Sequence, residues 1–196
     1  MTKFYPIGTP VPASTSTDRL LLRPLTVGHV DLDYDAVMAS REQLNRWSQT
    51  TWPTPNFTLA ENWADLDRHQ REHDEGVAFT YTVLDPTESR CLGCVYITPI
   101  PESATYLYPN DSYSARVTFW IRSDELASGL ESHLLATLRG WFAAEWPFDR
   151  VIHILSQQNP RQAGLLEEEG LVRRAAIALA DGRPCWVYDE PERASQ

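Results

Sequence analysis

A change in the spacing of apolar residues near the middle of the chain restricts the fold more than any other feature. Between Ala115 and Ile121 an apolar residue occupies every second position, which is the period of a strand with a buried face. Between Leu130 and Phe142 apolar residues recur every three or four positions, which is the period of an amphipathic helix. The segment between them is short and polar and contains Gly129, as a turn requires. The sequence therefore predicts a strand, a turn and a long helix in succession.

A second strand and helix follow this unit. Residues 151–156 form an apolar run, and after it Asn159 and Pro160 have the chemistry of a helix N-cap and of a first helical position. Gly170 and Leu171 come after the short helix that these two residues open. The second unit thus repeats the strand-to-helix connection of the first.

The remaining periodic segments complete an α+β arrangement. Helices are expected from residue 30 to about residue 40 and from residue 58 to 74, where Thr58 and Glu61 form a capping box. Long loops are expected at residues 46–57 and 101–112. The remaining strands are expected at residues 18–25, 77–84, 91–97, 172–179 and 183–188. This order predicts helices layered on a mixed, mostly antiparallel sheet.

The chain divides into three parts by composition. Residues 1–17 have no periodicity and contain several Pro, Thr and Ser, so they are expected to form a flexible arm. Residues 18–190 are enough for one domain with a single core. Residues 191–196 are expected to form a tail.

The charge balance limits the partners. The formal net charge is −10, which disfavours non-specific binding to nucleic acid or to an anionic membrane. The chain has no apolar run of about 18 residues that would span a bilayer. The first residues lack the apolar segment of a signal peptide, so a cytoplasmic protein is expected.

Cysteine usage points to packing more than to chemistry. The chain has three cysteines, and Cys91 and Cys94 have the spacing of a redox or zinc motif without a second pair. They lie at the start of an apolar strand, where cysteine packs as a small hydrophobic residue. We therefore expect structural thiols and no metal.

The order of elements and four short motifs resemble the GNAT superfamily of acyl-CoA-dependent N-acyltransferases. The nearest subgroup is that of the ribosomal-protein N-terminal acetyltransferases. The resemblance covers nearly the whole chain from residue 18 to 189. It rests on Arg19-Leu20-Leu21-Leu22-Arg23-Pro24, Phe119-Trp120-Ile121, Asn159 and Gly170-Leu171.

This resemblance implies a site and a reaction. The sheet would splay open between its fourth and fifth strands, those of Phe119 and residue 151, beyond Trp120. Acetyl-CoA would lie in that wedge as a co-substrate, without a metal. The acceptor would be an amine-bearing small molecule or a peptide N-terminus. A homodimer is left open, because the sequence does not give the oligomeric state.

The resemblance also assigns residues to the cofactor. Asn159 would orient the thioester. The backbone of the central strand would align the pantetheine, and the turn that follows would meet the phosphates. The strand residues are Phe119, Trp120, Ile121 and Arg122, and the turn residues are Ala127, Ser128, Gly129, Leu130, Glu131 and Ser132.

The turn departs from the family pattern. In relatives it begins with Arg or Gln and ends with Gly or Ala; here those positions are Leu126 and Glu131, and Gly129 alone agrees. A carboxylate about 5 Å from a phosphate costs roughly 1–3 kcal/mol. Two alternatives follow. Ser128 and Glu131 form a capping box that plugs the phosphate site, or Glu131 swings outward and the backbone cradle survives.

Catalytic groups are sparse. Asn159 is either a cofactor contact or a plain N-cap. No Tyr lies on the helix after it, which removes the general acid of many relatives. His153 is a candidate base if it faces the wedge, and a packed core residue otherwise. Further candidates are Tyr96, Glu102 and Asp111, and positioning alone is an alternative to all of them.

Trp47 and Trp52 lie in the loop that borders the acceptor pocket in GNAT-like folds. They would bind the acceptor, together with Tyr96, or pin the loop. The sequence therefore predicts an N-acetyltransferase. The competing readings are a GNAT-fold binding module that has lost cofactor use and a dimer-forming structural protein.

Overall fold

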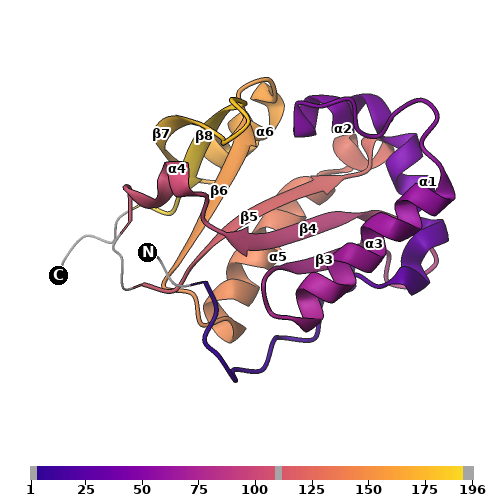
Figure 1. Ribbon diagram of the computed structural model, residues 1–196, viewed down its shortest axis with the longest axis horizontal. Coiled ribbons are helices and arrows are strands. Elements are labelled where there is room, and N and C mark those ends of the chain that lie inside the picture. The colour runs from indigo at the N-terminus through magenta and orange to yellow at the C-terminus, as the bar shows by residue number, and fades with distance from the viewer. Residues whose placement is uncertain (1–3, 109–111, 192–196) are drawn as a thin grey trace.

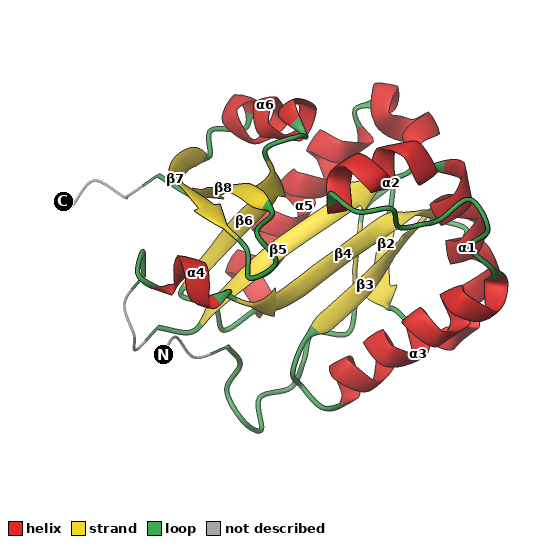
Figure 2. Cartoon of the chain, turned by 45° about the horizontal axis from the view of Figure 1, so that its top comes forward, coloured by secondary structure: helices red, strands yellow, loops and turns green. Residues whose placement is uncertain are grey.

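The computed structural model describes residues 4–108 and 112–191, and these form one open sheet of eight strands with helices on both faces (Figures 1 and 2). The strand order is β1-β2-β3-β4-β5-β6-β8-β7. Among the described strands β5 and β6 pair in parallel, and the other neighbours pair antiparallel. The strands are β1 Thr15–Ser16, β2 Leu21–Pro24, β3 Phe79–Leu84, β4 Cys91–Pro99, β5 Ser114–Ile121, β6 Arg150–Ser156, β7 Val172–Ala178 and β8 Pro184–Asp189. The predicted α+β fold is confirmed.

The helices pack on the two faces in distinct groups. On one face α5 covers the sheet, and on the other α1, α2 and α3 do. The described helices are η1 Val27–His29, α1 Val30–Ala39, α2 Arg41–Ser48, α3 Leu59–Asp74, α4 Glu102–Thr105, η2 Ser123–Ser128, α5 Leu130–Glu145 and α6 Pro160–Glu168.

The strand, turn and helix predicted at the centre of the chain are present as β5, η2 and α5. Phe119 and Ile121 of β5 lie in the core beneath α5, whereas Trp120 lies in the core beneath α1 to α3. This alternation follows from the pleat of a strand. The predicted capping box of α3 is also present. Glu61 N donates to Thr58 Oγ1 at 3.2 Å, and Thr58 N donates to the Glu61 carboxylate at 2.7 Å.

Two segments predicted as loops contain helix. In α2, which overlaps the first of them, Leu44 is the fully buried residue, so the helix gives almost no periodic apolar signal. The second segment contains the short helix α4, and residues 109–111 of that segment lie outside the described residues.

The segment expected to be a flexible arm is packed against the domain over its described residues. Phe4 stacks on Phe79 with 5.5 Å between ring centroids, and Tyr5 meets Phe79 edge-on at 4.9 Å. Thr15–Ser16 pairs with β2. Burial of these aromatic rings stabilises an ordered segment where the polar composition alone predicts none. The predicted tail lies, from residue 192 on, outside the described residues.

Within the described residues, none of the helices has the length and apolar character needed to cross a bilayer.

The parallel strands β5 and β6 separate along their length. They pair from Ser114↔Arg150 to Val117↔His153, and beyond that register they no longer pair with each other, although β5 stays paired with β4 and β6 with β8. Figure 2 shows the two strands diverging from their paired ends. The predicted splay is therefore present, but pairing ends at Val117, before the position that the sequence predicted.

Candidate functional site

We call the place where β5 and β6 no longer pair, beyond Val117 and His153, the opening. Side chains from two helices occupy the edge of β5 that faces it. The Phe119 carbonyl accepts a hydrogen bond from Trp47 Nε1 at 2.9 Å and another from Gln162 Nε2 at 3.0 Å. Gln43 Nε2 donates to the Ile121 carbonyl at 3.0 Å. A buried carbonyl without a partner costs free energy, and these donors replace the neighbouring strand. Helices α2 and α6 thus meet over the end of β5.

Glu131 extends this network. Its position matches neither the capping box nor the outward orientation that the sequence left open. Its side chain is 3% exposed, Gln162 Nε2 donates to its Oε1 at 3.3 Å, and Arg161 Nη2 lies 2.5 Å from its Oε2. The glutamate therefore points neither back to cap its own helix nor outward to solvent. Burial raises the pKa of Glu131, and the charge of Arg161 and the Gln162 hydrogen bond oppose that rise.

The start of α5 is capped by other means. Gly129 is the N-cap residue, with φ of 75°, in the left-handed region that glycine adopts at little cost. Ser128 Oγ accepts from Leu130 N at 3.2 Å and donates to the Glu125 carbonyl at 2.7 Å. Farther along the turn, Ser132 Oγ donates to Glu169. The capping box, one of the two alternatives, is not formed, because the Glu131 side chain contacts Arg161 and Gln162 of α6 instead.

Asn159 is the N-cap of α6, as predicted. Its Oδ1 accepts from Gln162 N at 3.3 Å, and its Nδ2 donates to Gln162 Oε1 at 3.1 Å. These two bonds fix the Gln162 side chain, which is 4% exposed, against Phe119. Asn159 therefore acts on the opening through Gln162.

His153 faces the opening but lies deep in the core. It is 5% exposed, its ring meets Phe119 edge-on at 6.1 Å, and its Nδ1 has no hydrogen-bond partner among the described residues. Burial lowers the pKa of His153 to about 4. A neutral, enclosed imidazole packs here as an aromatic residue.

The space between the diverging strands is nearly filled. A cavity of about 10 Å³ remains, lined by Val117, Thr118, Phe119, His153, Ile154, Leu155, Gln162 and Leu166. A cavity of that size holds at most one water molecule. The expected open slot is therefore closed by the side chains of the chain itself, Gln162 above all.

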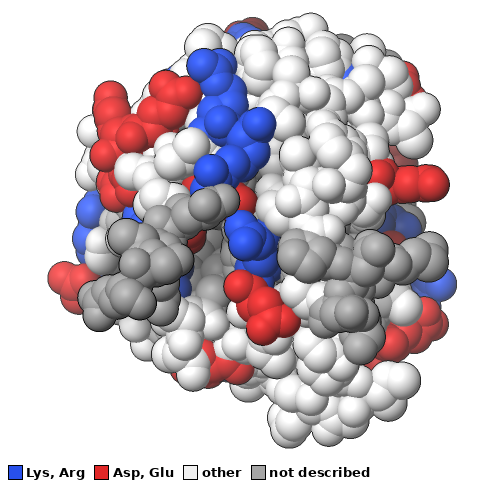
Figure 3. Space-filling model, turned by 90° about the vertical axis from the view of Figure 1, so that its left-hand side faces the viewer, with Lys and Arg blue, Asp and Glu red and all other residues white. Residues whose placement is uncertain are grey.

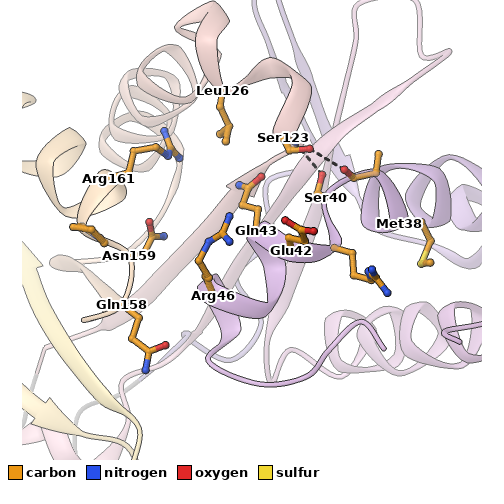
Figure 4. A pocket seen from close by; sticks show the side chains of 13 residues that line it. Met38, Ser40, Glu42, Gln43, Arg46, Ser123, Leu126, Gln158, Asn159 and Arg161 are labelled. Carbon is orange, nitrogen blue, oxygen red and sulfur yellow. Dashed lines mark hydrogen bonds between the residues drawn. The ribbon is translucent and has the colours of Figure 1, made fainter. Parts of the chain in front are cut away.

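A much larger pocket lies directly beside the opening. Its volume is about 650 Å³, within the range of small-molecule sites. The end of α1, helix α2, the start of η2 and the start of α6 enclose it (Figure 4). It is lined by Met38, Ala39, Ser40, Arg41, Glu42, Gln43, Arg46, Ser123, Leu126, Gln158, Asn159, Pro160 and Arg161.

The start of α6 separates the pocket from the opening. Asn159 and Arg161 line the pocket, whereas Gln162 lines the small cavity. Across the pocket, Gln43 and Arg46 extend from α2 on the side opposite Asn159 and Arg161 (Figure 4).

The pocket wall is held by two serine hydrogen bonds that join the start of η2 to the end of α1 and the residue after it. Ser123 N donates to Ser40 Oγ at 3.0 Å, and Ser123 Oγ donates to the Ala39 carbonyl at 2.8 Å (Figure 4). Arg122 is buried just before η2 and pairs with Asp35 at 2.9 Å and with Asp124 at 2.8 Å. The Arg122 guanidinium group is therefore already paired with carboxylates of the protein itself.

The predicted acceptor residues do not line this pocket. Trp47 caps the Phe119 carbonyl, and Trp52 meets the Phe57 ring edge-on at 6.0 Å. The Tyr96 hydroxyl accepts from Trp120 Nε1 at 3.2 Å. Glu102 lies in α4, and Asp111 lies outside the described residues.

Sequence reasoning missed the residues that give the pocket its charge. Arg41 and Arg46 come from α2, and neither forms an ion pair with any described residue. The sequence offers only a weak signal for them, a single buried apolar residue, Leu44, set among charged and polar residues.

Comparison with known proteins identifies the fold. No curated protein sequence matches the chain. Among solved structures, the RimL ribosomal L7/L12 α-N-protein acetyltransferase is 16% identical with a TM-score of 0.71, and the match covers 95% of this chain and 98% of that one. The ribosomal-protein-S5-alanine acetyltransferase of Vibrio fischeri is 16% identical with a TM-score of 0.68, covering 91% and 96%.

A third solved structure contains a cofactor. The microcin C7 self-immunity acetyltransferase MccE, in complex with acetyl-CoA and AMP, is 11% identical with a TM-score of 0.70, covering 89% of this chain and 93% of that one. At such identities the likeness concerns the fold. The family model of the acetyltransferase (GNAT) domain matches residues 19–172, most of the sequence. With its splayed parallel strands and this match, the chain belongs to the GNAT acetyltransferase family.

Proposed function

We propose that this protein is an N-acetyltransferase that transfers the acetyl group of acetyl-CoA to an amine, by direct attack in a ternary complex. The acceptor is an amine-bearing small molecule or a peptide N-terminus. Family membership supports the reaction class. Solved relatives named as ribosomal-protein acetyltransferases, one of them in complex with coenzyme A, support the cofactor and the acceptor class.

The observation that carries the proposal is the basic pocket beside the opened strands. The whole chain has a net charge of −10, yet this pocket contains Arg41 and Arg46 without ion pairs among the described residues. Guanidinium groups bind phosphates through charge-assisted hydrogen bonds. They supply the positive charge that the turn before α5 lacks because of Glu131.

The arginines at one end of the sheet, by contrast, form ion pairs within the fold. Figure 3 shows basic side chains between acidic ones on the side of the molecule that lies to the left in Figure 1. At that end of the sheet Arg150 and Arg174 both pair with Asp189, at 3.1 and 2.5 Å. The unpaired arginines of the pocket therefore differ from the arginines of that edge.

The reaction needs little from side chains beyond positioning. The neutral amine nitrogen attacks the thioester carbonyl, a C–N bond forms, the C–S bond breaks, and coenzyme A leaves as the thiolate. The nitrogen releases one proton to solvent as the amide forms, and the thiolate takes up one proton from solvent, so no net proton is gained or lost. A thiol has a pKa of about 8.5, so the leaving group is stable enough to depart without a tyrosine acid.

Glu42 is the carboxylate that lines the pocket. We assign it the binding of the cationic form of the acceptor amine. From this position the carboxylate attracts the acceptor and passes its proton to solvent.

A second candidate is a GNAT-fold binding module without normal acetyl-CoA use. Three contacts favour it. Gln162 and Trp47 occupy the Phe119 carbonyl, and Glu131 places a buried carboxylate at the start of α5. In an enzyme these side chains must move when the thioester arm enters.

The test is calorimetric titration of acetyl-CoA into the wild type, Arg46→Ala and Arg71→Ala. Arg71 is the control, because it is an exposed arginine of α3 that pairs with Asp67. We expect micromolar binding by the wild type and by the control. Loss of one charge-assisted contact, worth about 1.5 kcal/mol, weakens binding by Arg46→Ala roughly tenfold.

Mass spectrometry of amine acceptors incubated with acetyl-CoA then separates the two candidates. An acetylated acceptor supports the enzyme. Absence of both binding and transfer in the wild type favours the binding module.

A further inference from the structure

Two cysteines and one aspartate meet in the core on the face of the sheet covered by α1 and α3. Cys91 and Cys94 come from β4 and Asp33 comes from α1, and all three are buried. One ligand atom from each of them lies within 4.8 Å of the others. The cluster shares no residue with the pocket or the opening.

A β-bulge produces this arrangement. In a regular strand, residues three apart point to opposite faces. Here Leu84 pairs with Cys91 and Val83 pairs with Gly93, so Leu92 is an extra residue in β4. As a result Cys91 and Cys94 lie in the same core cluster, and Leu92 lies in the cluster on the other face.

Gly93 makes the bulge sterically accessible. Its φ is 157°, and a Cβ at this position would lie 2.0 Å from the Trp120 carbonyl oxygen. Bulges of this kind redirect side chains and commonly lie at functional positions. The Cys-Leu-Gly-Cys sequence thus encodes two thiols on one face.

The aspartate of the cluster lacks a positive partner. Asp33 is 3% exposed, and its carboxylate accepts hydrogen bonds from Asn62 Nδ2 at 3.0 Å and from Cys94 Sγ at 3.4 Å. No described arginine or histidine forms an ion pair with it. A carboxylate removed from water without a countercharge is costly, so the site is suited to a cation.

Asn62 gives a second, independent indication. It is 1% exposed, and its Oδ1 has no hydrogen-bond partner in the described part of the chain, although its Nδ2 bonds Asp33. A buried carbonyl oxygen next to the cluster is unsatisfied.

We propose that Asp33, Cys91 and Cys94 bind a thiophilic divalent cation, with Zn²⁺ as the ion whose chemistry fits best. Zinc takes thiolate and carboxylate ligands in tetrahedral sites. Bond lengths of about 2.3 Å to sulfur and about 2.0 Å to oxygen imply a sulfur-to-oxygen separation of about 3.5 Å. Cys94 Sγ lies 3.4 Å from Asp33 Oδ1, close to that separation.

Binding exchanges protons for the metal. Each thiol releases its proton to solvent as its sulfur becomes a thiolate ligand. The fourth position is available to an oxygen: the Thr82 hydroxyl lies 3.6 Å from Cys91 Sγ, and Asn62 adjoins Asp33. No oxidation or reduction takes place.

The ion would join α1 to the sheet. Asp33 lies in the first half of α1, and the last residues of the same helix, Met38 and Ala39, line the large pocket. A metal bridge from Asp33 to β4 would therefore fix one wall of that pocket. Its effect is structural, and it holds whatever the pocket binds.

The experiment measures metal directly. The full chain is produced in zinc-containing medium, desalted and analysed by elemental mass spectrometry, and a second sample is prepared with Co²⁺ for absorption spectroscopy. We expect about one metal per chain and the thiolate charge-transfer and d–d bands of tetrahedral cobalt. Cys94→Ser loses the metal and the bands. Cys185→Ser, which removes the third buried cysteine outside the cluster, keeps both.

A chelator experiment on the wild type keeps the test valid if Cys94→Ser does not fold. Removal of the metal lowers the melting temperature by several degrees, and zinc restores it, because binding to the native state alone stabilises it. A metal-free wild type whose melting temperature is indifferent to chelator and zinc overturns the proposal. In that case the thiols serve only as hydrogen-bond donors in the core.

Discussion

Individual side chains in this protein take their roles from burial. Glu131 stands where relatives have a small residue, and it turns inward because Arg161 and Gln162 offer partners there. His153 faces the opening, yet its enclosure makes the imidazole neutral. The sequence identifies both residues as candidates for the site. It does not reveal their partners, because those come from α6 and β5 across the fold.

The depressed pKa of His153 predicts sensitivity to acid. In the unfolded chain its pKa is near 6.5, and in the fold burial lowers it to about 4. Between these values the unfolded state binds more protons, so stability is full above about pH 6.5 and falls as the pH drops toward 4. At pH 5 the loss is on the order of 2 kcal/mol.

Urea unfolding of the wild type and His153→Leu at pH 7.5 and pH 5 measures this effect. The variant should lose less stability between the two pH values by that amount. An equal loss in both proteins would mean that other groups govern the acid response.

Some elements can be predicted from the sequence and others cannot. β5 and α5 were predictable because each buries a regular stripe of apolar residues. Helix α2 was not, because Leu44 alone is fully buried on it. The bulge in β4 could not be predicted either. A glycine between two cysteines does not indicate which residue of β4 lacks a partner in β3. The capping of Phe119 by α2 and α6 depends on where β5 and β6 part, which no local pattern specifies.

Alanine substitution should have opposite effects at two glycines, Gly93 in the β4 bulge and Gly140 in α5. Gly93→Ala places a methyl group 2.0 Å from a backbone oxygen and should destabilise the protein by at least about 2 kcal/mol. Gly140 lies within α5, and a Cβ there meets nothing within 4 Å, so Gly140→Ala should stabilise by up to about 1 kcal/mol. Denaturant midpoints give both values. A Gly93→Ala variant as stable as the wild type would show that β4 has another register.

The whole molecule combines an acidic chain with a locally basic pocket. Two helical layers enclose the sheet, and the only parallel pair among its described strands opens toward the pocket. The fold and the splay could be predicted from the sequence through the GNAT resemblance. The arginines of α2 and the closure by Gln162 could not, because they depend on how α2 and α6 meet.

For a thioester arm to lie along β5, the Gln162 side chain must leave the Phe119 carbonyl. Hydrogen–deuterium exchange of the wild type with and without acetyl-CoA tests this most directly. Acetyl-CoA should slow exchange at residues 118–122 and 128–132 by roughly tenfold or more, and leave β2 unchanged. Binding that protects α2 and α6 but leaves residues 118–122 unprotected would contradict it.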